Sequence, residues 1–204
     1  HLALAADHAA LVEAFVHLAE ATGDARWIDE GRAVADALLD TFWDDEAGGL
    51  FTAGHDADPL VARQKDLLDN ATPAANSLAA VGLSRLGALT GDATYVERAH
   101  QILALLAPTA VQHPGSLAHL LAAADLAVHG IDEVVIPGRT TDLVEVVQRR
   151  YLPGVVLAWG EPFDSPLWEG RQEGLAYACR DFACRLPVAT RAELLAELET
   201  LPHG

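Results

Sequence analysis

Residues 63–92 read RQKDLLDNATPAANSLAAVGLSRLGALTGD, and this stretch decides the fold because it joins a polar loop to an apolar helix. Pro73 fixes its φ angle near the helical value, so a helix is predicted to begin just after it. Over residues 78–89, only Ser84 and Arg85 interrupt the small and apolar side chains. A helix that is apolar on nearly all sides lies inside a protein. The stretch therefore predicts a buried helix over 75–89, with polar groups held at its start.

An earlier part of the chain repeats this pattern. Residues 11–28 (LVEAFVHLAEATGDARWI) align without gaps on residues 79–96 (AAVGLSRLGALTGDATYV), and Thr-Gly-Asp is identical in both copies. The glycine suits the left-handed position that ends one helix, and the aspartate suits the N-cap of the next. Each copy therefore predicts a helical hairpin. The residues in question are Gly23, Gly91, Asp24 and Asp92.

The predicted helices differ in charge, and this difference assigns them to layers. Those over 8–21, 75–89 and 116–128 carry few charged residues, whereas the helix over 25–41 carries many beside an apolar stripe. Apolar helices belong inside and charged helices outside. This alternation predicts a mainly α fold in which residues 1–130 form the later hairpins of a partial α/α toroid. A helical solenoid alternates in the same way and is the structural alternative.

The segment between the hairpins predicts a small β-hairpin insert near 48–63. Strand-like pieces near 50–52 and 60–62 are separated by Gly and Asp residues typical of turns. The neighbouring carboxylates suggest Ca²⁺, but their spacing lacks a calcium-loop pattern, so a solvated turn is favoured. These acidic residues are Asp44, Asp45, Glu46, Asp56 and Asp58.

The pattern changes after residue 130, and residues 131–204 predict a small α/β module with parallel strands. The expected elements are a strand over 133–136, a helix over 140–151, a strand over 155–159 and a third strand over 175–179. The first three form a βαβ unit, whose handedness makes its two strands parallel. Thr190 and Glu193 form a capping box before a final helix.

Composition excludes two classes of partner. Lys and Arg number 13 against 30 Asp and Glu, so the net charge of −17 repels nucleic acid and anionic membranes. No apolar run reaches the roughly 20 residues that a membrane span needs. Two cysteines are too few for a disulfide framework, so a reducing, cytoplasmic location is predicted. The chain begins at His1 and contains no Met, and we interpret it as a fragment that lacks an N-terminal portion.

The repeat also brings polar residues to one end of the helices, because its register places His8 opposite Asn76. A histidine with carboxylates can move a proton to or from a sugar, whereas amides and cations bind hydroxyls and oxyanions. The predicted catalytic residues are Asp7, His8, Asp66 and Asp69, and the predicted substrate-binding residues are Arg63, Lys65, Asn70, Asn76 and Ser77. No metal and no cofactor is predicted.

A structural role for these residues is the alternative. Asp66 and Asp69 suit caps or braces at the helix start, with Lys65 paired to one of them. His8 suits a structural or exposed position as well as a catalytic one.

Cys179 and Cys184 offer separate chemistry. A zinc site would need two more ligands, and no nearby His or Cys supplies them. A redox pair and two plain buried thiols are both left open.

Four segments, taken in order, resemble one known family. They are ADHAALVEAF (6–15), WDDEAGGLF (43–51), KDLLDNATPAANSLAAVGLSRLGALTGD (65–92) and AYACRDFACRLPV (176–188). Together they resemble the C-terminal part of the thioredoxin-domain proteins typified by spermatogenesis-associated protein 20. The resemblance implies an N-terminal thioredoxin-like domain joined to an α/α toroid similar to six-hairpin glycosidases and N-acylglucosamine 2-epimerase. This chain matches the later hairpins and the tail.

On this resemblance, we expect a fragment of a six-hairpin glycosidase-like toroid that binds or transforms a carbohydrate-like ligand. A glycosidase needs a pair of carboxylates, whereas an epimerase would rely on histidine. The alternative is a non-catalytic scaffold or interaction module that supports the thioredoxin-like domain missing from this chain. We also expect the helix over 8–21 to expose an apolar flank, including Leu11 and Phe15, that earlier hairpins would cover.

Overall fold

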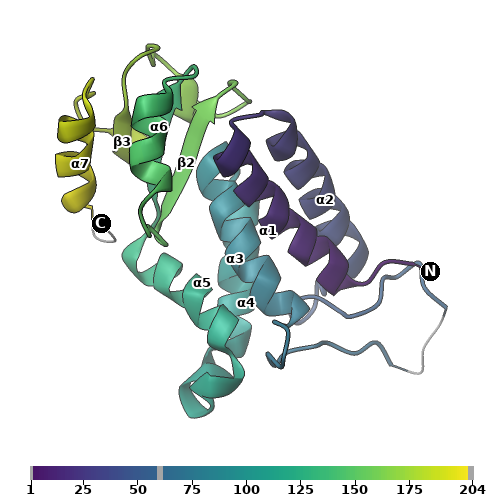
Figure 1. Ribbon diagram of the computed structural model, residues 1–204. Coiled ribbons are helices and arrows are strands. Elements are labelled where there is room, and N and C mark those ends of the chain that lie inside the picture. The colour runs from purple at the N-terminus through teal and green to yellow at the C-terminus, as the bar shows by residue number, and fades with distance from the viewer. Residues whose placement is uncertain (1, 59–61, 202–204) are drawn as a thin grey trace.

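The computed structural model describes residues 2–58 and 62–201 (Figure 1). Its first part is helical and contains α1 (Ala5–Thr22), α2 (Arg26–Phe42), α3 (Ala75–Thr90), α4 (Ala93–Gln112), the short 3-10 helix η1 (Pro114–Ser116) and α5 (Ala118–His129). Its second part contains β1 (Asp132–Pro137), α6 (Thr141–Gln148), β2 (Val155–Gly160), η2 (Pro166–Trp168), β3 (Tyr177–Arg180), β4 (Ala183–Cys184) and α7 (Arg191–Glu199). The predicted class, mainly helical with a C-terminal α/β part, is confirmed.

The helix α3 lies at the centre of the helical part. It packs between α1 and α5, while α2 and α4 lie outside this inner row (Figure 1). Every residue of α3 except Leu78 and Ala88 is buried, as the apolar stretch predicts. The closed toroid stays a prediction, because inner and outer rows of helices are common to a toroid segment and a solenoid.

The helix ends follow the repeated Thr-Gly-Asp. Gly23 and Gly91 have φ angles of 65° and 78°, and each N–H bonds back to the carbonyl four residues earlier. Asp92 is the N-cap of α4 and accepts a hydrogen bond from the Thr94 N–H. Asp24 lies one position before the N-cap of α2, although its carboxylate accepts from the Arg26 N–H at 3.1 Å.

The loop between α2 and α3 is irregular in its described residues. Leu50 forms a single antiparallel bridge with Trp43, and the Thr52 N–H donates to Gln64 at 2.7 Å. Part of the second expected strand, residues 59–61, lies outside the described residues. The Arg63 guanidinium donates to the Thr41 carbonyl at the end of α2 and to the Ala53 carbonyl in the loop, where a regular strand would supply N–H groups. Side chains thus take over hydrogen bonds that the predicted β-hairpin would have made.

The four strands form one mixed sheet in the order β2-β1-β3-β4. As the βαβ pattern predicts, β1 and β2 are parallel. In contrast to the predicted parallel module, β3 and β4 are antiparallel to their neighbours. The segment between β2 and β3 contains η2 and no longer helix, so it does not form the helical crossover that a parallel return needs.

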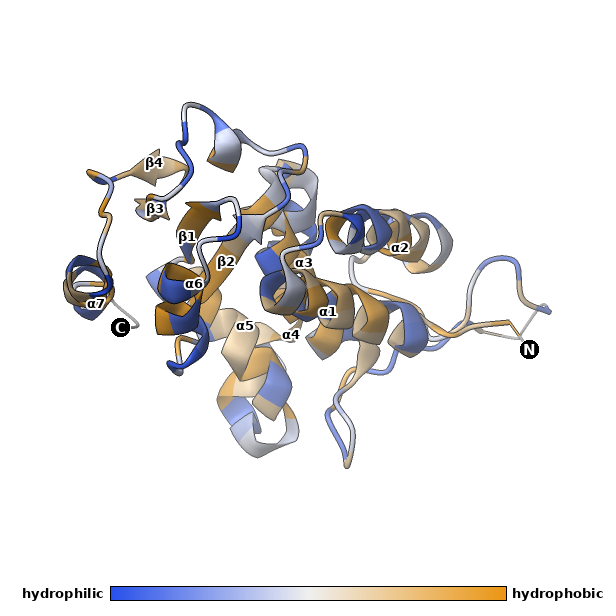
Figure 2. Ribbon diagram, turned by 45° about the horizontal axis from the view of Figure 1, so that its top comes forward, coloured by the Kyte–Doolittle hydropathy of each residue, from blue (hydrophilic) through white to orange (hydrophobic). Residues whose placement is uncertain are grey.

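The sheet separates two apolar layers (Figure 2). One face, including Val135 and Val156, joins the core of the five long N-terminal helices. The other face, including Val134 and Ile136, is covered by α6 and α7. The larger core is therefore continuous from the helices into the sheet.

A buried ion pair fastens the helices to β2. Arg85 of α3 pairs with Glu20 of α1 at 2.7 Å and also donates to the Val155 carbonyl at 2.9 Å. The same Glu20 oxygen accepts from the Leu157 N–H at 3.1 Å. Burial would raise the pKa of Glu20, but the hydrogen bond from His17 and the charge of Arg85 bring it below its usual value. This contact joins two helices and a strand through one carboxylate.

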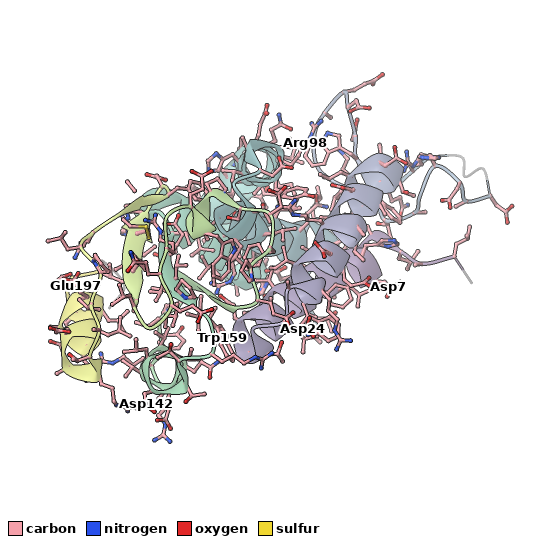
Figure 3. All side chains as sticks on the ribbon, turned by 90° about the horizontal axis from the view of Figure 1, so that it is seen from above. Asp7, Asp24, Arg98, Asp142, Trp159 and Glu197 are labelled. Atoms are coloured by element: carbon pink, nitrogen blue, oxygen red, sulfur yellow. A yellow bond between two sulfur atoms is a disulfide. The ribbon has the colours of Figure 1, made fainter. Side chains whose placement is uncertain are left out.

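Trp159 extends this junction to the end of α1, where it lies near Asp24 (Figure 3). Its indole N–H donates to the Glu20 carbonyl at 2.7 Å. A Cβ atom on Gly23 would lie 2.8 Å from the Trp159 ring. Glycine is thus needed there both for its φ angle and for the close approach of the indole.

Candidate functional site

Asn76 is one of two fully buried polar residues of the predicted site, with Ser77. The Asn76 amide oxygen accepts from the Leu50 N–H at 2.7 Å. Its amide nitrogen donates to the carbonyls of Leu50 at 3.1 Å and Asp66 at 3.0 Å. The amide therefore holds the irregular loop on the start of α3 and satisfies buried backbone groups.

Asp69 joins the starts of two helices. One carboxylate oxygen accepts from the Ala74 N–H at 2.9 Å, and the other accepts from the His119 N–H at 2.8 Å. Burial opposes ionisation of this group, yet hydrogen bonds from the Ala74 and His119 N–H groups bring the pKa of Asp69 below its usual value. The carboxylate thus connects α3 and α5, as the bracing alternative expects, and it reaches a second helix that the sequence did not indicate.

Lys65 and Arg63 fasten the loop to itself. Lys65 pairs with Asp44 at 2.7 Å and donates to the Gly48 carbonyl. The expectation that Lys65 pairs with Asp66 or Asp69 is therefore wrong. The Arg63 guanidinium lies 4.1 Å from the centre of the Phe51 ring and donates to the Ala53 carbonyl at 2.8 Å.

Asp44 forms the turn expected of the acidic insert. Its carboxylate accepts from the N–H groups of Glu46 at 2.9 Å and Ala47 at 3.1 Å. The hydrogen bond from Lys65 is the largest of the effects that lower the pKa of Asp44. Among the described residues, no group of three or more His, Cys, Asp or Glu side chains is arranged to hold a metal ion.

Asp7 and His8 belong to the start of α1, at the end opposite Asp24 (Figure 3). Asp7 accepts from the Leu4 N–H at 2.8 Å, which satisfies a free donor at the helix terminus. The half-buried His8 ring packs on Phe42, with 5.1 Å between ring centres.

The remaining predicted residues differ in exposure. Ser77 is buried next to Asp69, whereas Asp66 and Asn70 are exposed. The Asp66 side chain makes no hydrogen bond or ion pair within the part of the chain that the structure describes. The starts of α1 and α3 do meet the same loop, since Ala5 bonds to Thr52 and Asn76 bonds to Leu50. The predicted residues thus gather around one loop, most of them engaged with its backbone, and their catalytic and binding roles stay predictions.

Cys179 and Cys184 are bonded to each other as a disulfide. They face each other across the antiparallel pair of β3 and β4, which a two-residue turn of Asp181 and Phe182 connects. The interpretation as two plain thiols is wrong for this structure, because cross-strand pairing brought the sulfur atoms together. A redox role stays a prediction. A disulfide is also unusual for the reducing location that the cysteine count suggested.

Glu133 is a buried acid that the sequence interpretation treated only as the start of a strand. It is 3% exposed and lines a cavity at the junction of the sheet with α3, α4 and α5. Burial, with a smaller contribution from the charges of Asp181 and Asp132, raises the pKa of Glu133 to about 7. The signal for a buried acid in the sequence was the charged Glu133 at the start of the apolar stretch Val134 to Ile136.

Within residues 2–58 and 62–201, none of the helices combines the length and apolarity needed to cross a bilayer. This finding agrees with the absence of a long apolar run in the sequence.

Comparison with known proteins finds proteins of similar sequence. No family model matches the chain. Human spermatogenesis-associated protein 20 is 28% identical over 205 residues, which cover 92% of this chain and 26% of the human protein. The rat and mouse proteins of the same name are each 27% identical, with the same coverage. The resemblance indicated by the motifs is confirmed, and the chain is similar to spermatogenesis-associated protein 20 over about a quarter of that protein's length.

Proposed function

We propose that the chain is a non-catalytic structural module that packs against another helical segment of a longer protein through the exposed side of α1. This corresponds to the scaffold role that the family resemblance implies beside a thioredoxin-like domain. The predicted site residues support the proposal, because Asn76, Asp69 and Lys65 are each bonded to groups of the protein itself.

The observation that carries the proposal is that α1 is apolar on both sides. Its inner side, including Val12 and Val16, lies in the core. Its outer side exposes Leu11 and Leu18 by 44% and 37%, at the seven-residue spacing that places them on one stripe, and the N-cap residue Leu4 before the helix is 45% exposed. A surface helix normally shows polar residues to water, and α2 does so with Asp29, Glu30, Asp36 and Asp40.

The outer side of α1 also suits a helical partner. Ala10, Ala14 and Ala21 are exposed beside the leucines, and such small residues let another helix approach closely. Burying a leucine side chain completely contributes about 1.5–3 kcal/mol, so covering this stripe would contribute several kcal/mol. The relatives are long enough to supply such a segment, since this chain spans about a quarter of their length.

The test uses the human relative with its homologous segment removed as the binding partner. Wild-type chain is expected to bind it, with slower hydrogen exchange along α1. The variant Leu11→Glu/Leu18→Glu is expected to bind at least about tenfold more weakly, because charge would be buried in the contact. The matched control is Val111→Glu/Val128→Glu, at sites 83% and 78% exposed on α4 and α5. Equal weakening by both double variants, or no binding by the wild type, would contradict the proposal.

A carbohydrate-like ligand at the loop is the second candidate. The observation that favours it is the exposed carboxylate of Asp66, which has no partner among residues 2–58 and 62–201 and whose backbone carbonyl accepts from Asn76. A panel of monosaccharides titrated into the chain should then bind saturably and lose affinity in Asp66→Asn. Glycosidase-like or epimerase-like turnover would be sought among the sugars that bind, and absence of saturable binding would exclude this candidate.

A further inference from the structure

A cavity of about 240 Å³ lies where the sheet meets the helical part. It is beside the C-terminal half of α3, whereas the α2–α3 loop leads into the N-terminal end of that helix. Three helices, the turn after α5, strand β1 and the β3–β4 turn all contribute to its wall. Most of the wall is apolar. The lining residues that matter here are Val96, Leu126, Ile131 and Phe182, together with the polar His100, Glu133 and Asp181.

Glu133 brings a buried carboxylate to this wall. Its Oε2 atom is buried and has no hydrogen-bond partner in the described part of the chain. The Phe182 N–H donates to the carboxyl group, and Cys179 is its neighbour across the β1–β3 pair. A carboxylate buried beside a cavity is unfavourable without a partner charge, so a ligand that placed a cation beside Glu133 would be stabilised.

The charges around the cavity favour a cation over an anion. Asp181 adds a second carboxylate to the wall. The nearest guanidinium, that of Arg180, is engaged by Asp132 through two contacts of 2.8 Å. The charge of Glu133 also acts on Arg180, but the hydrogen bond to Asp132 is the larger effect on that guanidinium.

We propose that this cavity binds a small primary ammonium compound with an apolar body. Its charged head pairs with Glu133, and its body lies against Val96, Leu126 and Phe182. The volume of about 240 Å³ is below the roughly 300–1,000 Å³ of sites for drug-sized ligands, so the ligand is small. The site is separate from the α1 surface, and neither proposal depends on the other.

The protonation of Glu133 makes the proposal sensitive to pH. Its pKa of about 7 means that the free carboxyl loses its proton near neutrality. An ammonium head favours the ionised carboxylate, so affinity should rise from pH 6 to pH 8. Of the other groups facing the cavity, α4 contributes His100 and the β3–β4 turn contributes Asp181, while α3 and α5 contribute no charged lining residue. His100→Gln removes the histidine that lines the cavity and belongs in the test as a control.

The experiment titrates the 204-residue chain with cyclohexylamine and, as a neutral compound of the same shape, cyclohexanol. Binding is followed by NMR at pH 6, 7 and 8. The amine is expected to bind saturably, at least about tenfold more tightly than the alcohol at pH 8. Its affinity should rise with pH in both the wild type and His100→Gln. Glu133→Gln should weaken it by at least about tenfold, and the exposed control Asp142→Asn should not change it.

A second variant tests whether the amine binds in this cavity, and it leaves Glu133 unchanged. Ala127 lines the cavity from an exposed position on α5, so Ala127→Trp should block the site while the chain stays folded, as its circular dichroism would report. The proposal is overturned if neither compound binds saturably, or if folded Ala127→Trp binds like the wild type. It is also overturned if the alcohol binds as well as the amine with affinity that falls as pH rises, since Glu133 would then act as a protonated donor.

Discussion

The side-chain amide of Asn76 pairs with both backbone groups of Leu50, accepting from its N–H at 2.7 Å and donating to its carbonyl at 3.1 Å. A neighbouring strand would offer Leu50 the same two groups. One side chain on α3 therefore does locally what a second strand would do, and the loop needs no regular sheet at this point.

Asn76→Ala is expected to destabilise the protein because it leaves the Leu50 groups without partners in a buried place. The loss should be about 2–4 kcal/mol, which is comparable to that of Leu83→Ala in the core of α3. Urea unfolding of both variants measures this directly. The exposed Asp66→Ala is the control and should change stability by less than about 0.5 kcal/mol. An Asn76→Ala protein as stable as the wild type would contradict this structural role of the amide.

Ionised Asp69 should make the free energy of unfolding fall as the solution becomes acidic. Its pKa is lowered in the folded state, so its stabilising contribution is present above the ordinary pKa of 3.8 and is lost as pH falls through the lower folded value. Asp69→Asn should therefore flatten the loss of stability below about pH 4. At pH 7, the same variant should cost about 1–3 kcal/mol because it weakens two helix-terminal bonds. Unfolding curves from pH 2.5 to pH 7 provide the measurement, and an unchanged acid slope would contradict it.

Local features of the fold were predictable from the sequence because they depend on neighbouring residues. Gly23 and Gly91 end their helices, and Thr190 with Glu193 forms the capping box before α7. The apolar texture of α3 likewise specifies burial whatever packs around it.

The site was less predictable because its decisive contacts join residues far apart in the chain. An Asn in the first turn of a helix has the same local sequence whether it binds a ligand or, as Asn76 does, the Leu50 backbone. Lys65 had nearby acids as candidate partners, yet the loop brings it to Asp44. The direction of β3 and the bond between Cys179 and Cys184 follow from sheet pairing, which no short motif encodes.

Replacing Arg85 alone should destabilise the protein more than replacing Arg85 and Glu20 together. Arg85→Met leaves the Glu20 carboxylate buried without its cation, which is expected to cost about 3–5 kcal/mol. The double variant Glu20→Leu/Arg85→Met removes both charges and should recover a large part of that loss. A double-mutant cycle by urea unfolding tests the coupling. Additive losses would mean that the ion pair does not hold the helices to the sheet.

Glu133 should make the protein less stable as pH rises through neutrality. Its pKa is raised from 4.5 to about 7, so between these values the folded chain binds a proton that the unfolded chain has lost. Stability contributed by this proton is present in full below pH 4.5 and is lost as pH approaches and passes 7, by a total on the order of 3 kcal/mol. Glu133→Gln resembles the protonated form at every pH, so it should match the wild type at pH 4, below the unfolded-state value of 4.5, and exceed it at pH 8. Comparing the two proteins by urea unfolding at both pH values cancels the titration of the histidines that they share, and parallel stability profiles would show that Glu133 ionises as an ordinary surface acid does.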